Sequence, residues 1–451
     1  MARIQQAVRS KEIMNDWTIG ELEDWDNKIC KIGESYGLDW FDIDYEIIDY
    51  HEMIGAMSYT GMPTHYRHWS FGKSFELTHA KYTMGQTGLP YEMIINSNPS
   101  IAYLMKENPL STHLLTMAHC VGHSDFFKNN RMFKHTDPDN VINRFKLGAK
   151  RIQEYLGDPS IGVEKVENII DACHAIKYQI PRTPGIIRRS NDELRAIYAE
   201  KMLDDEDGIY DDINLDKVPL ERDYNLLAFI RENSRNLTDW QRDVMLIVEE
   251  NSQYFLPQAY TKIMNEGWAV LIHEKIMKEL DLPHKHHLAF IKLHNQVVRP
   301  HLGSVNPYHL GYTIFKKIEE AEGLDACLLA REVHNDVSFL RKYLDEETCR
   351  ELNLFAFSFK KRNNQHTIDD VSNEDGWTNV RDALISTVGL NSVPVVYVEE
   401  LMKDSTLRII HEHDGRDIDL RDAQRVYDHI KQLWGDDVLF TTIIEEEPWE
   451  F

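Results

Sequence analysis

The chain lacks long apolar segments and paired cysteines, and these absences limit the class of protein it can be. No stretch of the 451 residues approaches the roughly 18 uninterrupted apolar residues of a transmembrane helix, so we expect no membrane span. The N-terminal residues show no apolar core of a signal peptide. The five cysteines are scattered and form no C-x-x-C pair, which favours a reducing compartment. We therefore expect a cytoplasmic location.

Basic residues are scarce relative to acidic ones. The chain has 50 Lys and Arg against 75 Asp and Glu, a formal net charge of −25. A strongly acidic surface repels phosphate backbones and anionic lipids, so nucleic acid and membranes are disfavoured as partners. The sequence indicates no particular protein partner.

The periodicity of apolar residues predicts a mainly α fold of the α+β type. The chain is longer than one ordinary hydrophobic core requires, so more than one domain is expected. Helical patterns dominate residues 1–360, interrupted by a short strand at 91–96. After Phe359 the composition changes, and residues 361–451 alternate between strand and helix patterns. We therefore predict a large helical domain, 1–360, and a small C-terminal α+β domain, 361–451.

The segment from Ser111 to Asn130 reads as an amphipathic helix with Ser111 as its N-cap. His119 and His123 are four residues apart, so their imidazoles share one helix face. Such a pair suits two ligands of one transition metal. Among 21 His, about one pair with this spacing is expected by chance. Two buried, hydrogen-bonded core histidines are therefore an open alternative.

A second helix, predicted to begin at Pro257, supplies further donors. Glu266 would add a carboxylate to the imidazoles of His119 and His123. Two His and one carboxylate are the ligands that a protein supplies to an open zinc-type site. His273, seven residues later, shares its face and is a candidate fourth ligand or general acid. Cys120 occupies the position where the H-E-x-x-H signature has its general base. The base must then come from another element.

Two carboxylates are candidates for that base. Glu92 lies on the predicted strand before the His119 helix, and Glu250 lies on a helix before Pro257. A separate loop, G-M-P-T-H-Y-R-H-W, brings three further candidates, His65, His68 and Trp69. A loop so rich in aromatic and imidazole groups is either the substrate-binding wall of an active site or a well-packed connector.

A family resemblance is carried by five segments, residues 61–73, 91–105, 118–130, 254–269 and 306–315. On these segments the chain resembles the stage V sporulation protein R family over most of its length. The resemblance implies a soluble bacterial or archaeal protein from a family that spore formers use in making the peptidoglycan cortex. The segment N-E-G-W-A also resembles the glutamate segment of gluzincin peptidases, which implies His119, His123 and Glu266 as metal ligands.

The sequence leaves three functions open. The first is a metal-dependent hydrolase, with zinc as the expected metal and an amide bond of a peptide or peptidoglycan-like molecule as substrate. The second is a redox enzyme, because two His and a carboxylate also bind non-haem iron, with manganese as a further alternative. The third is a scaffold protein in which a metal or polar cluster holds helices together.

Overall fold

The computed structural model describes residues 16–86, 88–90, 92–183, 185–203, 209–210, 213–301, 304–360, 365–373 and 376–451. Contacts between residues divide the chain into two compact units, each built from two stretches of sequence. Unit 1 comprises residues 1–149 and 257–392, and unit 2 comprises 150–256 and 393–451. The predicted domain boundary after residue 360 stays a prediction.

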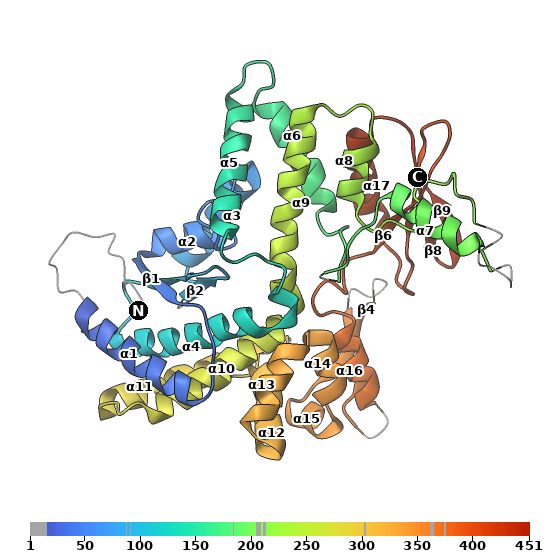
Figure 1. Ribbon diagram of the computed structural model, residues 1–451. Helices are drawn as coiled ribbons and strands as arrows, with labels where there is room; N and C mark the ends of the chain where they lie inside the picture. The colour runs from blue at the N-terminus through green and yellow to red at the C-terminus, as the bar shows by residue number, and fades with distance from the viewer. Residues whose placement is uncertain are drawn as a thin grey trace. The chain divides into compact units, whose positions relative to one another are not determined.

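Unit 1 is mostly helical, as Figure 1 shows. Its first stretch contains α1 (Ile19–Ser35), β1 (Ile43–Ile48), α2 (Tyr50–Ser58), α3 (Trp69–Thr83), β2 (Glu92–Ile95), β3 (Ser100–Met105), α4 (Leu110–Asn129), a 3-10 turn (Arg131–Phe133) and the start of α5 (Val141–Gly157). Its second stretch contains α10 (Lys262–Glu279), α11 (His284–Val297), α12 (Pro307–Glu322), α13 (Leu324–Val333), α14 (Asp336–Tyr343), α15 (Glu346–Glu351), β4 (Phe355–Lys360), β5 (Gln365–Val371) and α16 (Trp377–Ile385).

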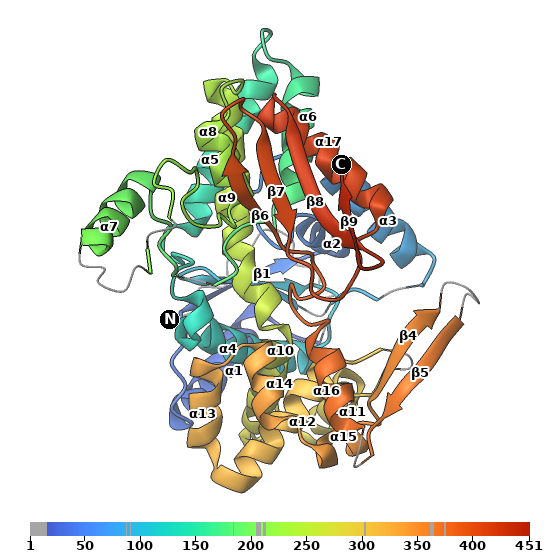
Figure 2. The same cartoon turned by 90° about the vertical axis from the view of Figure 1, so that its right-hand side faces the viewer.

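Unit 2 combines helices with a four-stranded sheet in the order β6-β7-β8-β9. Figure 2 shows this sheet, and α17 packs against both β8 and α6. Its elements are the end of α5, α6 (Val163–Ile176), α7 (Asn191–Leu203), α8 (Leu226–Asn233), most of α9 (Asp239–Tyr260), β6 (Val396–Leu401), β7 (Leu407–His411), α17 (Leu420–Trp434), β8 (Val438–Ile444) and β9 (Glu447–Glu450). The predicted mainly α fold with a small C-terminal α+β region is confirmed.

A three-stranded sheet in unit 1, in the order β1-β3-β2, packs against α4. β1 runs parallel to the central strand β3, and β2 pairs with β3 antiparallel in the register Glu92↔Leu104. β2 is thus an edge strand, and Glu92 is its first residue. The predicted strand at 91–96 corresponds to β2.

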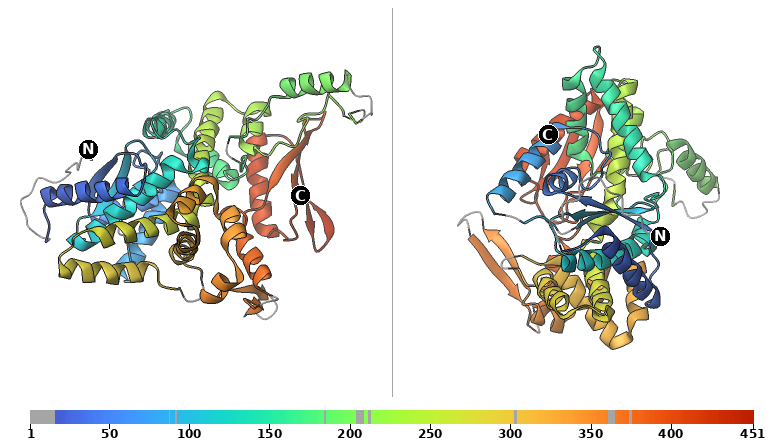
Figure 3. Two further views of the ribbon diagram at one scale, coloured as in Figure 1. Left: turned by 60° about the horizontal axis from the view of Figure 1, so that its bottom comes forward. Right: turned by 90° about the vertical axis from the view of Figure 1, so that its left-hand side faces the viewer.

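α4 is buried on every side rather than on one stripe. All of its residues from Leu110 to Phe127 are buried, which corrects the amphipathic helix expected from the sequence. It packs against α1, α10, α11 and α13 as well as the sheet, and Figure 3 shows α1, α4, α10 and α11 lying side by side. The predicted N-cap, Ser111, is also two positions off, since the helix begins at Leu110 with Pro109 as its N-cap.

Small residues let α4, α10 and α12 approach closely. A Cβ added to Gly122 of α4 would lie 2.7 Å from the Cα of Ala269 in α10. A Cβ added to Gly267 of α10 would overlap the backbone of Gly311 in α12. The two contacts bring the backbones of three helices together. Gly122, in the contact between α4 and α10, is the neighbour of His123 in the sequence.

α10 begins later than the sequence suggested. Pro257 lies inside α9, and α10 starts at Lys262. The carboxylate of Asp336 accepts hydrogen bonds from the backbone N–H groups of Ile263 and Met264, each at 2.9 Å. This buried side chain from α14 satisfies N–H groups that the first turn of a helix leaves free. A long-range contact therefore sets the start of α10.

None of the helices in the described ranges has both the length and the apolar character needed to cross a membrane.

Candidate metal centre

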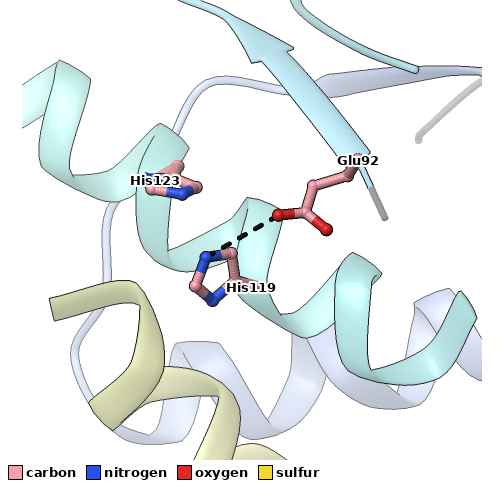
Figure 4. Close-up of side chains that lie close together, drawn as sticks. All are labelled: Glu92, His119 and His123. Atoms are coloured by element: carbon pink, nitrogen blue, oxygen red, sulfur yellow. Dashed lines mark ion pairs between the residues drawn. The ribbon is translucent and has the colours of Figure 1, made fainter. Parts of the chain in front are cut away.

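His119 and His123 project from one face of α4 into the interior. Their side chains are 3% and 7% exposed, and their ring centroids are 4.5 Å apart with the ring planes nearly perpendicular. Figure 4 shows both imidazoles beside the carboxylate of Glu92, at the start of β2. One potential ligand atom from each of these three residues lies within 4.8 Å of the others.

Glu266 enters the same cluster from α10. Its Oε2 atom lies 3.4 Å from Nε2 of His123 and 3.7 Å from Nε2 of His119. Oε1 of Glu92 lies 3.8 Å from Nε2 of His119. Two ligand atoms about 2.0–2.2 Å from one ion at a tetrahedral angle are about 3.3–3.6 Å apart. The observed spacings are close to those of donors around a shared cation.

The two carboxylates have opposite electrostatic environments. Burial raises the pKa of Glu92 above its usual value of 4.5, and the nearby imidazoles offset this only in part. Burial also acts to raise the pKa of Glu266, but His119, His123 and Lys262 outweigh it and lower that pKa well below 4.5. Glu266 is thus held ionised, whereas Glu92 more readily accepts a proton.

A second layer of side chains orients the imidazoles. The Oδ1 atom of Asn265 lies 2.8 Å from Nδ1 of His123 and accepts a hydrogen bond from the N–H group there. The lone pair of His123 Nε2 is then directed toward Oε2 of Glu266. That carboxylate oxygen is buried and makes no hydrogen bond within the described part of the chain. Oε2 of Glu266 and the lone pair of His123 Nε2 thus repel each other in the interior, and a cation between them would remove this repulsion. The residues therefore fit a metal ion.

The structure gives His273 a different place from the ligand position expected in the sequence. Its Nδ1 lies 2.9 Å from Nδ1 of His119, and its Nε2 lies 3.0 Å from Nδ1 of His294. Both ring nitrogens are therefore engaged with other imidazoles. His273 lies behind His119, on the side of that ring away from the carboxylates. Its coordination of a metal stays untested, and the geometry favours an orienting role.

Comparison with known proteins assigns the family. The family model described as SpoVR like protein matches residues 16–393, which is most of the chain. The chain belongs to the SpoVR-like protein family. It is also 32% identical to "Uncharacterized protein YcgB" of Escherichia coli strain K12, over 94% of this chain and 92% of that relative. No solved structure matches the chain. The membership confirms the predicted family and supports its link to sporulation.

The remaining predicted site residues of this SpoVR-like chain lie elsewhere. Glu250 is on α9, in the sequence assigned to unit 2, whereas the cluster around His119 belongs to unit 1. His65 packs edge-on against two aromatic rings, with centroid distances of 4.7 Å to Phe71 and 5.5 Å to Phe145. His68 is the N-cap of α3, and Trp69 is 49% exposed. A role of these four residues in catalysis or substrate binding stays a prediction.

Sequence reasoning missed Tyr308, although it lies in one of the segments that carry the family resemblance. It follows Asn306 and Pro307 at the start of α12, and its ring lies 6.2 Å from that of His119. The negative charges of Glu266 and Glu92, together with burial, raise the pKa of its hydroxyl far above 10. The hydroxyl is therefore a neutral hydrogen-bond donor facing the two carboxylates. Its only sequence signal is the N-P-Y segment itself.

Unit 2 contains a second polar site, which we call the arginine-lined cleft. This cavity of about 970 Å³ is lined by four arginines and as many Asp and Glu side chains. Arg188 pairs with Asp223 at 2.6 Å and with Glu232 at 2.7 Å. The guanidinium of another of these arginines donates to two backbone carbonyls. The arginines of the cleft are Arg182, Arg188, Arg189 and Arg222.

Proposed function

We propose that this SpoVR-like chain is a metal-dependent hydrolase that cleaves an amide bond, with zinc as its metal. The observation that carries the proposal is the convergence of His119, His123 and Glu266 around a buried carboxylate oxygen without a hydrogen bond. Two imidazoles and one carboxylate form the protein half of an open catalytic zinc site. A bound divalent ion supplies Lewis acidity and lowers the pKa of a coordinated water.

The side chains of this site have separate roles as metal ligand, general base and hydrogen-bond donor. Glu266 is held ionised and serves as a ligand, whereas the raised pKa of Glu92 suits a general base that takes a proton from water. Glu92 thereby replaces the glutamate that H-E-x-x-H enzymes carry at the position of Cys120. Tyr308 donates a hydrogen bond from its neutral hydroxyl to the negative oxygen that forms on an attacked carbonyl.

The proposed class of substrate rests on the family resemblance. The link to sporulation and the cortex suggests a peptide or peptidoglycan-like molecule whose amide bond is attacked. A cytoplasmic location is part of the proposal, because all five cysteines of the chain are free. A cytoplasmic enzyme would act on peptidoglycan precursors or on peptides rather than on the assembled wall.

The test is elemental analysis of protein purified without added metal, followed by hydrolysis assays on peptides and on peptidoglycan precursor peptides. We expect about one zinc per chain and turnover that a chelator abolishes and zinc restores. Arg188→Ala, in the arginine-lined cleft, is the control that keeps the metal. A chain that binds no metal at all would favour the scaffold alternative.

The donor set also supports a second candidate, a redox enzyme using iron or manganese. Glu92 lies close enough to His119 to join Glu266, giving two imidazoles and two carboxylates. Such oxygen-rich sets suit iron and manganese. Anaerobic purification separates the candidates, because iron that changes oxidation state on exposure to oxygen would favour the redox reading over hydrolysis.

A further inference from the structure

Three buried imidazoles from three helices form a continuous chain behind the metal centre. His119 of α4, His273 of α10 and His294 of α11 are at most 9% exposed. Nδ1 of His119 lies 2.9 Å from Nδ1 of His273, and Nε2 of His273 lies 3.0 Å from Nδ1 of His294. We call these residues the histidine ladder. Two consecutive imidazole–imidazole hydrogen bonds fully engage the middle ring.

The ladder can hold its protons in two arrangements. A neutral imidazole carries one N–H and one lone pair, so each bond needs a donor on one ring and an acceptor on the next. If His119 donates from Nδ1, then His273 must accept at Nδ1 and donate from Nε2 to His294. If His294 donates from Nδ1, both bonds run the other way. The direction of one bond therefore determines the other.

We propose that metal binding at His119 selects the direction of the histidine ladder, and that His294 is a positioning residue of the metal centre. This inference rests on the metal site of the proposed function. A metal at Nε2 of His119 uses the lone pair of that nitrogen, so the proton must reside on Nδ1. His119 then donates to His273, and His273 donates to His294, which holds its own proton on Nε2.

The metal-free protein favours the opposite direction. Nε2 of His119 faces the carboxylates of Glu266 and Glu92 at 3.7 and 3.8 Å, and an N–H there is attracted by both charges. His119 then accepts at Nδ1, and both bonds run from His294 toward the centre. Metal binding reverses the ladder without charging any ring. One proton leaves Nε2 of His119, and one is taken up at Nε2 of His294.

A polar network lies beside the outer end of the ladder. The ring of Tyr312 on α12 lies 5.5 Å from the ring of His294, and its hydroxyl donates to Glu274 at 2.8 Å. Lys278 pairs with the same carboxylate, and Lys316 lies 3.9 Å from it. The inner end of the ladder, in contrast, meets the two carboxylates of the metal centre.

The first test is nitrogen NMR of the full chain labelled with ¹⁵N-histidine, measured with and without Zn²⁺. The chemical shifts of the ring nitrogens report which nitrogen carries the proton. We expect His119, His273 and His294 to exchange their tautomers together when zinc is added. Identical tautomers of His273 and His294 in the two states would overturn the proposal, and this test needs no mutant.

The second test compares zinc affinity in two variants at the outer residue. His294→Phe removes the acceptor for His273, and we expect zinc binding about tenfold weaker or more, as for other residues that orient a metal ligand. In His294→Asn the amide oxygen can stand where Nδ1 stood, so affinity should stay within about threefold of the wild type. His286→Phe, another buried imidazole of α11, is the matched control and should bind zinc normally.

The outcomes separate this proposal from the proposed function. Wild-type affinity in His294→Phe, with the same thermal stability as His294→Asn, overturns the ladder and leaves the metal centre intact. Coupled tautomer exchange without any hydrolysis supports the ladder and counts against the hydrolase. A wild-type chain that does not bind zinc overturns both.

Discussion

The metal centre in unit 1 and the arginine-lined cleft in unit 2 are both polar, but their groups are satisfied differently. In the cleft, Arg188 has carboxylate partners at hydrogen-bonding distance. In the metal centre, a buried oxygen of Glu266 faces two imidazole nitrogens at distances too long for good hydrogen bonds. The cleft is a large cavity, whereas the metal centre contains a buried carboxylate oxygen that no hydrogen bond from the described residues satisfies and that a cation would neutralise.

This contrast teaches that cavity volume alone is a weak guide to function. Paired charges around an open space largely neutralise one another and leave little electrostatic attraction for a ligand. Burying several polar ligand atoms without partners destabilises the folded protein, and such a cluster is typical of a site where a bound ligand compensates for this loss. The predictions below test whether the two regions differ in this way.

The largest effect is expected from removing a ligand. His119→Ala and Glu266→Ala should each abolish stoichiometric metal binding while helix content stays close to that of the wild type, because each removes a donor from a three-donor set. Metal analysis and circular dichroism measure the two quantities. Arg188→Ala in the arginine-lined cleft is the opposite case and should keep full metal occupancy. Full occupancy in both ligand variants would remove the distinction between the regions.

The second-largest effect is expected at Glu92, and it distinguishes a general base from a metal ligand. Glu92→Gln should keep the metal and the fold but lower turnover by at least about 100-fold, since it cannot accept a proton. A base must be ionised, and burial raises the pKa of Glu92, so wild-type turnover should fall on acidification at a pH above 4.5. A pH–rate profile checks this. Loss of metal from Glu92→Gln would instead make Glu92 a ligand.

Close packing of α10 against α12 gives a third prediction. Gly267→Ala places a methyl group where the backbone of Gly311 lies, and we expect a loss of about 1–3 kcal/mol with weakened metal binding, because Glu266 is the adjacent residue. Gly55→Ala in α2 meets no atom within 4 Å and should be neutral or slightly stabilising. Thermal unfolding of both variants measures the difference. Equal stability of the two would show that the helix crossing is not tight.

A truncation tests which unit carries the metal. A chain ending at residue 392 retains all of the sequence assigned to unit 1 but loses β6 to β9 and α17. We expect it to keep the metal and to lose stability in residues 150–256, because α17 packs against α6 and the hydroxyl of Ser234 donates to the carbonyl of Trp434. Ending the chain at residue 360, the predicted domain boundary, also removes α16. Hydrogen exchange would localise the loss in each case.

The smallest effect is expected at Cys120. Burial raises the pKa of its thiol well above the usual value, and nearby Glu92 and Asp26 add to this, so the thiol stays neutral and unreactive. Cys120→Ala should keep metal and activity and cost at most about 1–2 kcal/mol as a small cavity. An inactive Cys120→Ala with its metal bound would point to thiol chemistry instead.

The sequence alone determined the local part of this site. Helical periodicity places His119 and His123 on one face because residues four apart are neighbours on any α-helix. The N-E-G-W-A segment indicated Glu266, and the strand pattern at 91–96 placed Glu92 on an extended element. Each of these conclusions depends on residues close together in the chain.

The tertiary structure decided how these pieces meet. Spacing puts His273 on the face of Glu266, but the crossing of α4 and α10 at Gly122 and Ala269 turns it behind His119. The start of α10 depends on Asp336. Tyr308 of α12 lies near His119, and His294 of α11 is joined to that residue through His273, and no local periodicity in the sequence indicates either position. Backbone geometry repeats with every residue and can be read locally, whereas helix crossings depend on packing between distant segments.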